Sequence, residues 1–238
     1  MRLTADITQS LVYLIGDVHG CHDQLIDLEG KIVRDAANFS GRKQIVMLGD
    51  YVDRGPQSAQ VIDHLASPPP EGFERTCLTG NHEIAMLDYL DGRISLAAWL
   101  PMGANATLLS YGVDLEHLSG YRSTEQLDEV ILSVIPDRHV DFLRSLPILV
   151  DAGRFLFVHA GIRPGTPLDQ QTDDDLVFIR GDFYNATHLL ERWVVHGHTP
   201  IDKPQPEGRR INIDTGAFYT GRLTALRLWK NKGRVLST

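Results

Sequence analysis

Apolar and polar positions follow one another along the chain in short blocks, and these blocks predict strands and helices in turn. Apolar runs rich in β-branched and aromatic residues, each ending at or near a glycine or histidine as buried strands often do, occupy residues 11–15, 44–48, 75–79, 154–158 and 193–195. Between the first three runs, helical periodicity covers residues 23–38, 57–66 and 83–90. Strands that alternate with helices at this spacing predict an α/β fold with parallel strands, which places ligands at the carboxyl ends of the strands.

The middle and the end of the chain follow other patterns. Residues 96–146 contain no metal-ligand motif and predict helices joined by loops, which we expect to form a cap over one rim of the site. Residues 210–213 and 223–229 return to a β pattern and suggest a second sheet. Because the sequence shows no repeat, low-complexity tract or linker, we expect residues 1–238 to form a single catalytic domain.

Short polar motifs follow the ends of the predicted strands. They are Gly16-Asp17-Val18-His19-Gly20, Gly49-Asp50-Tyr51-Val52-Asp53-Arg54-Gly55, Gly80-Asn81-His82-Glu83, Val158-His159-Ala160-Gly161 and His196-Gly197-His198-Thr199. Aspartate, histidine and asparagine are metal ligands, glycine allows close backbone approach, and arginine binds phosphate. This combination predicts a hydrolase with two metal ions.

The motif residues divide between two expected metal sites. The first would be built from Asp17, His19 and Asp50, and the second from Asp50, Asn81, His159 and His198. Two divalent cations roughly 3.5–4 Å apart, bridged by Asp50, would share a water and lower its pKa until it is hydroxide near neutrality. Such a centre keeps a local positive charge, so it can attract a phosphate although the protein as a whole is acidic.

The remaining motif residues suit phosphoryl transfer. Arg54, which follows the second strand, and Arg180 can clamp the non-bridging phosphate oxygens with forked donors. His82 adjoins Asn81 and is better placed to protonate a leaving oxygen than to bind metal, and Asp53 could keep that imidazole charged and oriented. No serine or cysteine stands in a nucleophile context. Direct attack by the metal-bridging hydroxide is therefore the simpler mechanism.

Composition narrows the class of protein and of partner. The net charge is −8 over 238 residues, with 23 Lys and Arg against 31 Asp and Glu, so neither nucleic acid nor an anionic membrane is an expected main partner. No apolar run approaches the length of a membrane span. Cys21 and Cys77 are the only cysteines, so no disulfide framework is implied and we expect a cytoplasmic protein.

The motifs resemble those of a known family, the phosphoprotein phosphatase branch of the calcineurin-like metallophosphoesterases. The shared pattern is GDxHG, GDxVDRG and GNHE followed by two later histidines, and the likeness runs from Gly16 to about Gly216 with order and spacing kept. The resemblance implies a β-sandwich of two mixed sheets flanked by helices, a dinuclear metal centre and phosphomonoester hydrolysis. It also implies the ligand set given above, with His82 and Asp53 as the acid pair and Arg54 and Arg180 on the phosphate.

The resemblance also suggests a substrate, with one alternative. Pro200 stands where broader metallophosphoesterases carry the last histidine of GHxH, as in the protein phosphatases, and the C-terminal segments resemble the short bacterial and phage enzymes. The leading interpretation is a protein phosphatase that acts on phosphoserine, phosphothreonine or phosphotyrosine in a protein or peptide. The alternative is a symmetrical diadenosine tetraphosphate hydrolase, because those enzymes share much of the motif set. A catalytically dead scaffold is disfavoured, since every ligand and the acid are present.

Some features stay open on sequence alone. Imidazole and oxygen ligation admits Mn, Fe, Zn or Co, among which we expect Mn²⁺ to support activity in vitro. His196 precedes the last ligand turn, where a structural role is favoured. Arg163 could reach substrate or form a salt bridge at the rim. The sequence gives no oligomeric state.

Overall fold

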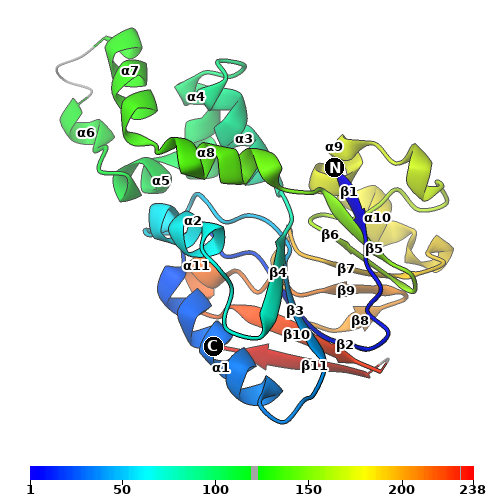
Figure 1. Cartoon of the computed structure of the whole chain (residues 1–238). Coiled ribbons are helices and arrows are strands. Elements are labelled where there is room, and N and C mark those ends of the chain that lie inside the picture. The colour runs from blue at the N-terminus through cyan, green and yellow to red at the C-terminus, as the bar shows by residue number, and fades with distance from the viewer. Residues whose placement is uncertain (119–122, 231) are drawn as a thin grey trace.

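The computed structural model describes residues 1–118, 123–230 and 232–238. Within these residues, two β-sheets pack face to face and helices cover their outer sides (Figure 1). The sheet that follows the N-terminal motifs has the order β11 (Lys232–Ser237), β10 (Thr224–Trp229), β2 (Ser10–Ile15), β3 (Arg42–Met47) and β4 (Phe73–Cys77). The other has the order β1 (Arg2–Thr4), β5 (Leu149–Ala152), β6 (Phe155–Val158), β7 (Trp193–His196), β9 (Arg210–Asn212) and β8 (Pro206–Glu207).

Both sheets are mixed. Strands β2, β3 and β4 run parallel, whereas β10 pairs antiparallel with both β2 and β11. In the other sheet, β1 with β5, β6 with β7, and β7 with β9 are parallel pairs, and β5 with β6 and β8 with β9 are antiparallel pairs. The expected α/β fold with two mixed sheets flanked by helices is therefore confirmed.

The helices fall into three groups along the chain. Two that follow strands of the first sheet are α1 (His22–Ala36) and α2 (Ser58–Ala66). The middle of the chain forms α3 (Asn81–Leu90), α4 (Leu96–Trp99), η1 (Leu100–Met102), α5 (Ala104–Ser110), α6 (Leu115–Leu118), α7 (Thr124–Val134) and α8 (Asp137–Ser145). The later ones are η2 (Leu168–Gln170), α9 (Asp173–Phe178), α10 (Gly181–Asn185), η3 (Thr187–Leu189) and α11 (Ala217–Thr220). The helices of the middle group cluster at one side of the sheets (Figure 1).

The side chains of β2 show why the fold has layers. Val12 and Leu14 point into the apolar layer between the two sheets, where they pack with residues of β6 and β7. Leu11, Tyr13 and Ile15 belong to the layer between the first sheet and its helices. Because successive strand residues point to opposite faces, a fully apolar run such as this one must be covered on both sides.

The structure has the second sheet that the pattern of the tail suggested, but only part of the tail belongs to it. Residues 210–212 form β9, which extends the sheet of β6 and β7, whereas residues 224–229 form β10, which extends the sheet of β2. The periodicity predicts that a segment is a strand, but it carries no information on which neighbour the strand pairs with. The expectation that residues 1–238 form one domain stays a prediction.

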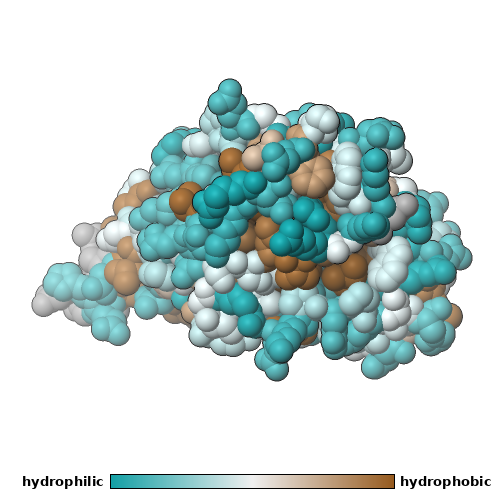
Figure 2. Space-filling model, turned by 90° about the horizontal axis from the view of Figure 1, so that it is seen from below, coloured by the Kyte–Doolittle hydropathy of each residue, from teal (hydrophilic) through white to brown (hydrophobic). Residues whose placement is uncertain are grey.

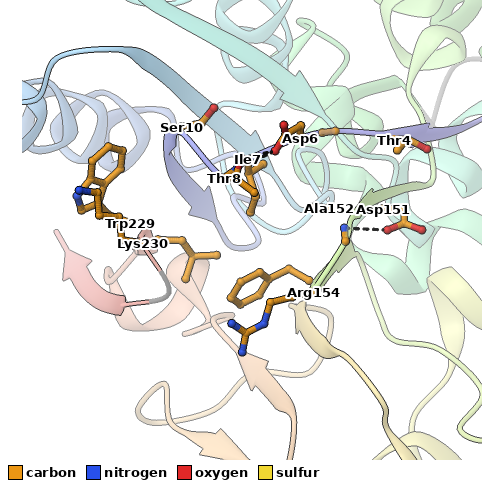
Figure 3. Close-up of a pocket in the computed structure, with 14 residues that line it drawn as sticks. Thr4, Asp6, Ile7, Thr8, Ser10, Asp151, Ala152, Arg154, Trp229 and Lys230 are labelled. Atoms are coloured by element: carbon orange, nitrogen blue, oxygen red, sulfur yellow. Dashed lines mark hydrogen bonds between the residues drawn. The ribbon is translucent and has the colours of Figure 1, made fainter.

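The end of the sandwich opposite the ligand motifs contains a cavity of about 510 Å³. Figure 3 shows that it lies between the segment Thr4–Ser10, the turn around Asp151 and Arg154, and the end of β10 at Trp229 and Lys230. Apolar side chains also gather in the middle of the face seen from below (Figure 2). None of the sequence-predicted site residues lines this cavity.

No helix among the described residues is long and apolar enough to span a bilayer.

Candidate dinuclear metal centre

The loops that follow the strands hold the predicted site residues in an unusual backbone conformation. The φ angles are 43° at His19, 54° at Asp50, 69° at Asp53, 68° at Arg54 and 71° at His198. Positive φ is uncommon for residues with a side chain and costs free energy, so it persists only where the surroundings enforce it. These left-handed turns aim ligand-type side chains from separate strands toward one another.

Three of the predicted ligands bring acceptor atoms together. His159 Nε2 lies 3.0 Å from Asn81 Oδ1 and 3.1 Å from His198 Nδ1, and the last two atoms are 2.8 Å apart. His159 Nδ1 lies 2.9 Å from the Leu48 carbonyl oxygen, to which it donates, so the Nε2 of the neutral ring carries a lone pair. Burial lowers the pKa of His159 and, to about 2, the pKa of His198, which favours neutral rings. Lone pairs that converge in this way fit a cation.

The other half of the centre shows the same pattern. His19 Nδ1 donates to the Val52 carbonyl oxygen over 2.8 Å, so its buried Nε2 presents a lone pair that has no hydrogen-bond partner. That nitrogen lies 3.5 Å from Asp50 Oδ2, and His159 Nε2 lies 3.5 Å from the same oxygen. Burial lowers the pKa of His19 to about 3. Asp50 therefore stands between the two halves, where a bridging carboxylate is needed.

Asp17 is placed less directly than the sequence suggested. Its Oδ2 accepts the backbone N–H of His198 over 2.9 Å, and its buried Oδ1 has no hydrogen-bond partner. Burial and the nearby carboxylates of Asp214 and Asp50 raise the pKa of Asp17 well above its ordinary value. Crowded buried carboxylates with an unpartnered oxygen are what a bound cation would neutralise, so the residues present fit a metal centre.

Among the described residues, histidine and carboxylate side chains form two groups whose ligand atoms lie within 4.8 Å of one another, and one of them differs from the prediction. One cluster is Asp50, His159 and His198, and the other is His19, Asp50 and His82. His82 takes the place expected for Asp17, yet both of its ring nitrogens face other groups. Nδ1 lies 2.7 Å from Asp53 Oδ2 and Nε2 lies 3.1 Å from an Arg54 guanidinium nitrogen.

The His82–Asp53 pair is anchored by the helical middle of the chain. The indole Nε1 of Trp99 donates to Asp53 Oδ2 over 3.0 Å, and the Thr107 hydroxyl donates to Asp53 Oδ1 over 2.8 Å. Burial opposes protonation of His82, but Asp50 and Asp53 outweigh it and raise the pKa of this imidazole. A raised pKa keeps a proton available for transfer.

The two predicted arginine clamps are exposed at the rim of this centre. Arg54 lies with its guanidinium carbon 5.0 Å from the centroid of the Phe218 ring, and its backbone N–H donates to the Gly103 carbonyl over 3.2 Å. Arg180 donates to the Thr199 hydroxyl over 3.2 Å. Exposed guanidinium groups beside buried ligands suit a phosphate that enters from solvent.

Several residues of the site were not predicted from the sequence. The Glu83 carboxylate accepts the backbone N–H groups of Asp50, Tyr51 and Gly80 and thus fixes the ligand loop. The GNHE motif contained this residue, but nothing in its spacing gave it a partner. Asp214, whose pKa burial raises to about 6, accepts from the N–H of Gly216.

The histidine and arginine whose roles were open have structural contacts. His196 is buried with its ring centroid 5.0 Å from that of Phe183, and its Nε2 lies 3.4 Å from an Arg210 nitrogen. Arg163 forms ion pairs with Asp175 and Asp182, at 2.6 and 3.1 Å.

Comparison with known proteins gives this geometry a family. The family described as calcineurin-like phosphoesterase matches residues 10–232. The chain belongs to this family. Membership implies a dinuclear centre of divalent metal ions, in agreement with the ligand groups that the structure brings together.

Curated relatives within the family carry an informative name. Proteins named bis(5'-nucleosyl)-tetraphosphatase PrpE, asymmetrical, are 28% identical in Bacillus velezensis and 27% identical in Bacillus subtilis (strain 168). Both matches cover 90% of this chain and, in that order, 87% and 89% of the relative.

Solved structures agree on the fold. A crystal structure provisionally named as a diadenosine tetraphosphatase superposes with a TM-score of 0.68 at 22% identity, covering 100% of this chain and 96% of that one. A protein serine/threonine phosphatase from Saccharomyces cerevisiae gives a TM-score of 0.61 at 13% identity, with 100% and 82% coverage. At these identities the likeness concerns the fold alone.

The expected protein phosphatase, with its phosphorylated protein or peptide partner, is wrong. The relatives that span nearly the whole chain are named for dinucleoside tetraphosphates, which supports the alternative, and their name specifies asymmetrical rather than symmetrical cleavage. The error has a physical reason. The motifs specify metal ligands and phosphate contacts, which every phosphoester substrate needs, whereas the group attached to the phosphate is recognised by residues outside them.

Proposed function

We propose that this chain hydrolyses dinucleoside tetraphosphates asymmetrically, to a nucleoside triphosphate and a nucleoside monophosphate. The observation that carries the proposal is the match, over 90% of the chain, to relatives named for that activity. The site supports it with exposed arginines beside a buried cluster of metal ligands, an arrangement that suits a polyanionic substrate.

We assign the metal ions to the place where the acceptor atoms of the predicted ligands converge. In the proposal they are held by Asp17, His19, Asp50, Asn81, His159 and His198. When bound, they polarise phosphate oxygens and lower the pKa of a water. We propose Mn²⁺ as the ion that supports activity, which reconstitution of metal-free protein with Mn, Fe, Zn or Co would test. The cytoplasm remains the proposed location, and Cys21 and Cys77 are both free thiols.

The chain's own groups then perform three tasks. Arg54 and Arg180 hold non-bridging oxygens of the phosphate that reacts. Asp53 accepts the Nδ1 proton of His82 and so fixes the orientation of the ring, whose Nε2 faces the guanidinium of Arg54. His82 passes a proton from Nε2 to the oxygen that leaves.

Diadenosine tetraphosphate is the substrate that tests the proposal. Purified protein with added metal should consume it, and chromatography should show ATP and AMP in equal amounts. A parallel preparation of the Asp50→Asn variant controls for contaminating hydrolases. A pair of ADP molecules as product would overturn asymmetrical cleavage, and absence of turnover under conditions where a phosphopeptide is hydrolysed would overturn the function itself.

A further inference from the structure

Two aromatic side chains stand exposed on the short helix α11. Phe218 is 38% exposed and Tyr219 is 61% exposed, and their rings are in edge contact at 4.9 Å between centroids. Aromatic rings that are exposed to water do not gain the free energy of burial. An exposed pair next to a functional centre therefore indicates a binding surface.

Phe218 connects this pair to the candidate metal centre. Its ring lies 5.5 Å from the His19 ring, edge to face, and 5.0 Å from the guanidinium carbon of Arg54. The pair therefore borders the place where Arg54 would hold a phosphate. A group that binds to this aromatic pair could therefore be joined by a short linker to the phosphate at Arg54.

The backbone around α11 holds the pair in place before any ligand arrives. Gly216 has φ 64°, and a β-carbon at this position would overlap the Tyr219 ring, so the ring lies directly over the glycine. Asp214 Oδ1 accepts the Gly216 N–H over 2.8 Å, and the Thr220 hydroxyl donates to the Thr215 carbonyl over 2.8 Å. An aromatic face that is already ordered costs little entropy when a ligand stacks on it.

We propose that Phe218 and Tyr219 form a stacking platform for the nucleobase nearest to the reacting phosphate. The inference rests on the proposed function, which supplies a substrate with a base at each end of a phosphate chain. Flat bases stack on aromatic side chains, and the gain is about 1–3 kcal/mol per base in nucleic-acid complexes. Tyr219 provides the more exposed ring, and Phe218 joins it to the phosphate clamp.

The position of the platform also specifies which phosphorus reacts. The phosphate nearest to a base is the α-phosphate, so a base held beside Arg54 brings the α-phosphorus to the centre. The oxygen of water forms a bond to this phosphorus, and the bond to the bridging oxygen of the β-phosphate breaks. The bond's electron pair leaves with the nucleoside triphosphate, and the nucleoside monophosphate carries the oxygen from water.

Binding measurements test the platform apart from catalysis. Titration calorimetry on metal-loaded protein would compare AMP with inorganic phosphate in the wild type and in Tyr219→Leu, which keeps an apolar side chain but removes the aromatic face. We expect AMP to bind about 10-fold more weakly to the variant, in line with the stacking energy above, while phosphate affinity is unchanged. Tyr219→Trp should retain AMP affinity, and Val235→Ala, on β11 with 43% exposure, serves as a surface control.

Kinetics and isotope labelling complete the test. For diadenosine tetraphosphate, Tyr219→Leu should raise KM about 10-fold with little change in kcat. In ¹⁸O-water the label should appear in AMP and not in ATP. Equal AMP affinity in wild type and Tyr219→Leu would overturn the platform while leaving the proposed function standing, and label in ATP would overturn attack at the α-phosphorus. Failure of the wild type to cleave the substrate would instead count against the function, since AMP binding is measured separately.

Discussion

The main chain orients two of the three predicted ligand histidines, whereas side chains from a distant helical segment orient the proposed acid. His19 and His159 each donate Nδ1–H to a backbone carbonyl, that of Val52 in the loop after β3 and that of Leu48 directly at the end of β3. The pair of His82 and Asp53 depends instead on Trp99 and Thr107 of the helical middle.

This difference has consequences for function. A backbone carbonyl next to a strand end, such as that of Leu48, moves only if the sheet moves, so this half of the ligand cluster should be as rigid as the core of the sandwich. The acid pair depends on the contacts of Asp53 with Trp99 and Thr107, which follow it by 46 and 54 residues in the sequence. These contacts could be altered without disturbing the strands. The comparison predicts that metal binding and acid function respond to different substitutions.

The largest effect should come from Asp50, which stands between the two halves of the ligand cluster. Replacing it with Asn removes the shared anionic ligand, so we expect metal content to fall and turnover to drop by several orders of magnitude. Elemental analysis and kcat/KM for diadenosine tetraphosphate measure both. Asp173→Asn, at an exposed aspartate, is the matched control. Full metal content with intact activity in Asp50→Asn would show that Asp50 is not needed to hold the metal ions. It would thus contradict the distinction between the ligand cluster and the acid pair.

Arg54 should separate substrate binding from metal binding. Arg54→Ala should retain its metal ions yet lose about 10²–10³-fold in turnover, the loss typical when a preorganised donor is removed from a transition state. Arg54→Lys should rescue little of this, because a point charge does not reproduce a forked donor. Arg180→Ala, which removes the guanidinium that donates to the Thr199 hydroxyl at the rim, is the comparison. If Arg54→Ala loses metal in proportion to activity, then the residue is structural.

The sequence indicates the ligand-type side chains that the structure brings together, but it indicates the surroundings of the proposed acid only in part. Ligands such as Asp17 and His19 follow strands whose apolar pattern is visible locally, and parallel strands bring their carboxyl ends to one edge. The anchors of Asp53 could not be found this way. Trp99 and Thr107 are a buried tryptophan and a buried threonine in a helical segment, and only the tertiary fold gives them a partner.

Short length or polar composition explains three of the strands that the pattern did not predict. Strand β1 has three residues and β8 has two, which is too short for a period to be visible. Strand β11 is largely exposed and polar along its length, so its pattern does not differ from that of a loop. Its place in the sheet comes from pairing with β10.

His82 should matter in proportion to the basicity of the group that leaves. His82→Asn should slow alkyl phosphate esters, where a substrate of that kind is accepted, by roughly 10²–10⁴-fold. The loss for diadenosine tetraphosphate should be markedly smaller, because a phosphate leaving group needs little protonation. Asp53→Asn should show the same selectivity in milder form, and metal content should stay unchanged in both. Equal losses on both substrates would assign His82 to phosphate binding, and loss of a metal ion would make it a ligand.

The smallest effect should come from the anchors of Asp53, and it tests the comparison most directly. Thr107→Val keeps the volume of a fully buried side chain but removes the hydroxyl that donates to Asp53 Oδ1. A hydrogen bond to a charged group contributes about 1.5–3 kcal/mol, part of which affects folding and part the acid. We therefore expect a loss of about 10-fold or less in kcat for alkyl esters, a smaller loss for diadenosine tetraphosphate, and no change in metal content.

Thr107→Ser, which keeps the hydroxyl, should restore the wild-type ratio between the two substrates. Trp99→Phe should follow Thr107→Val, because its indole N–H donates to the other oxygen of the same carboxylate. If these variants lower the unfolding temperature but leave the ratio of the two substrates unchanged, the helical segment supports the fold alone and does not act on the acid.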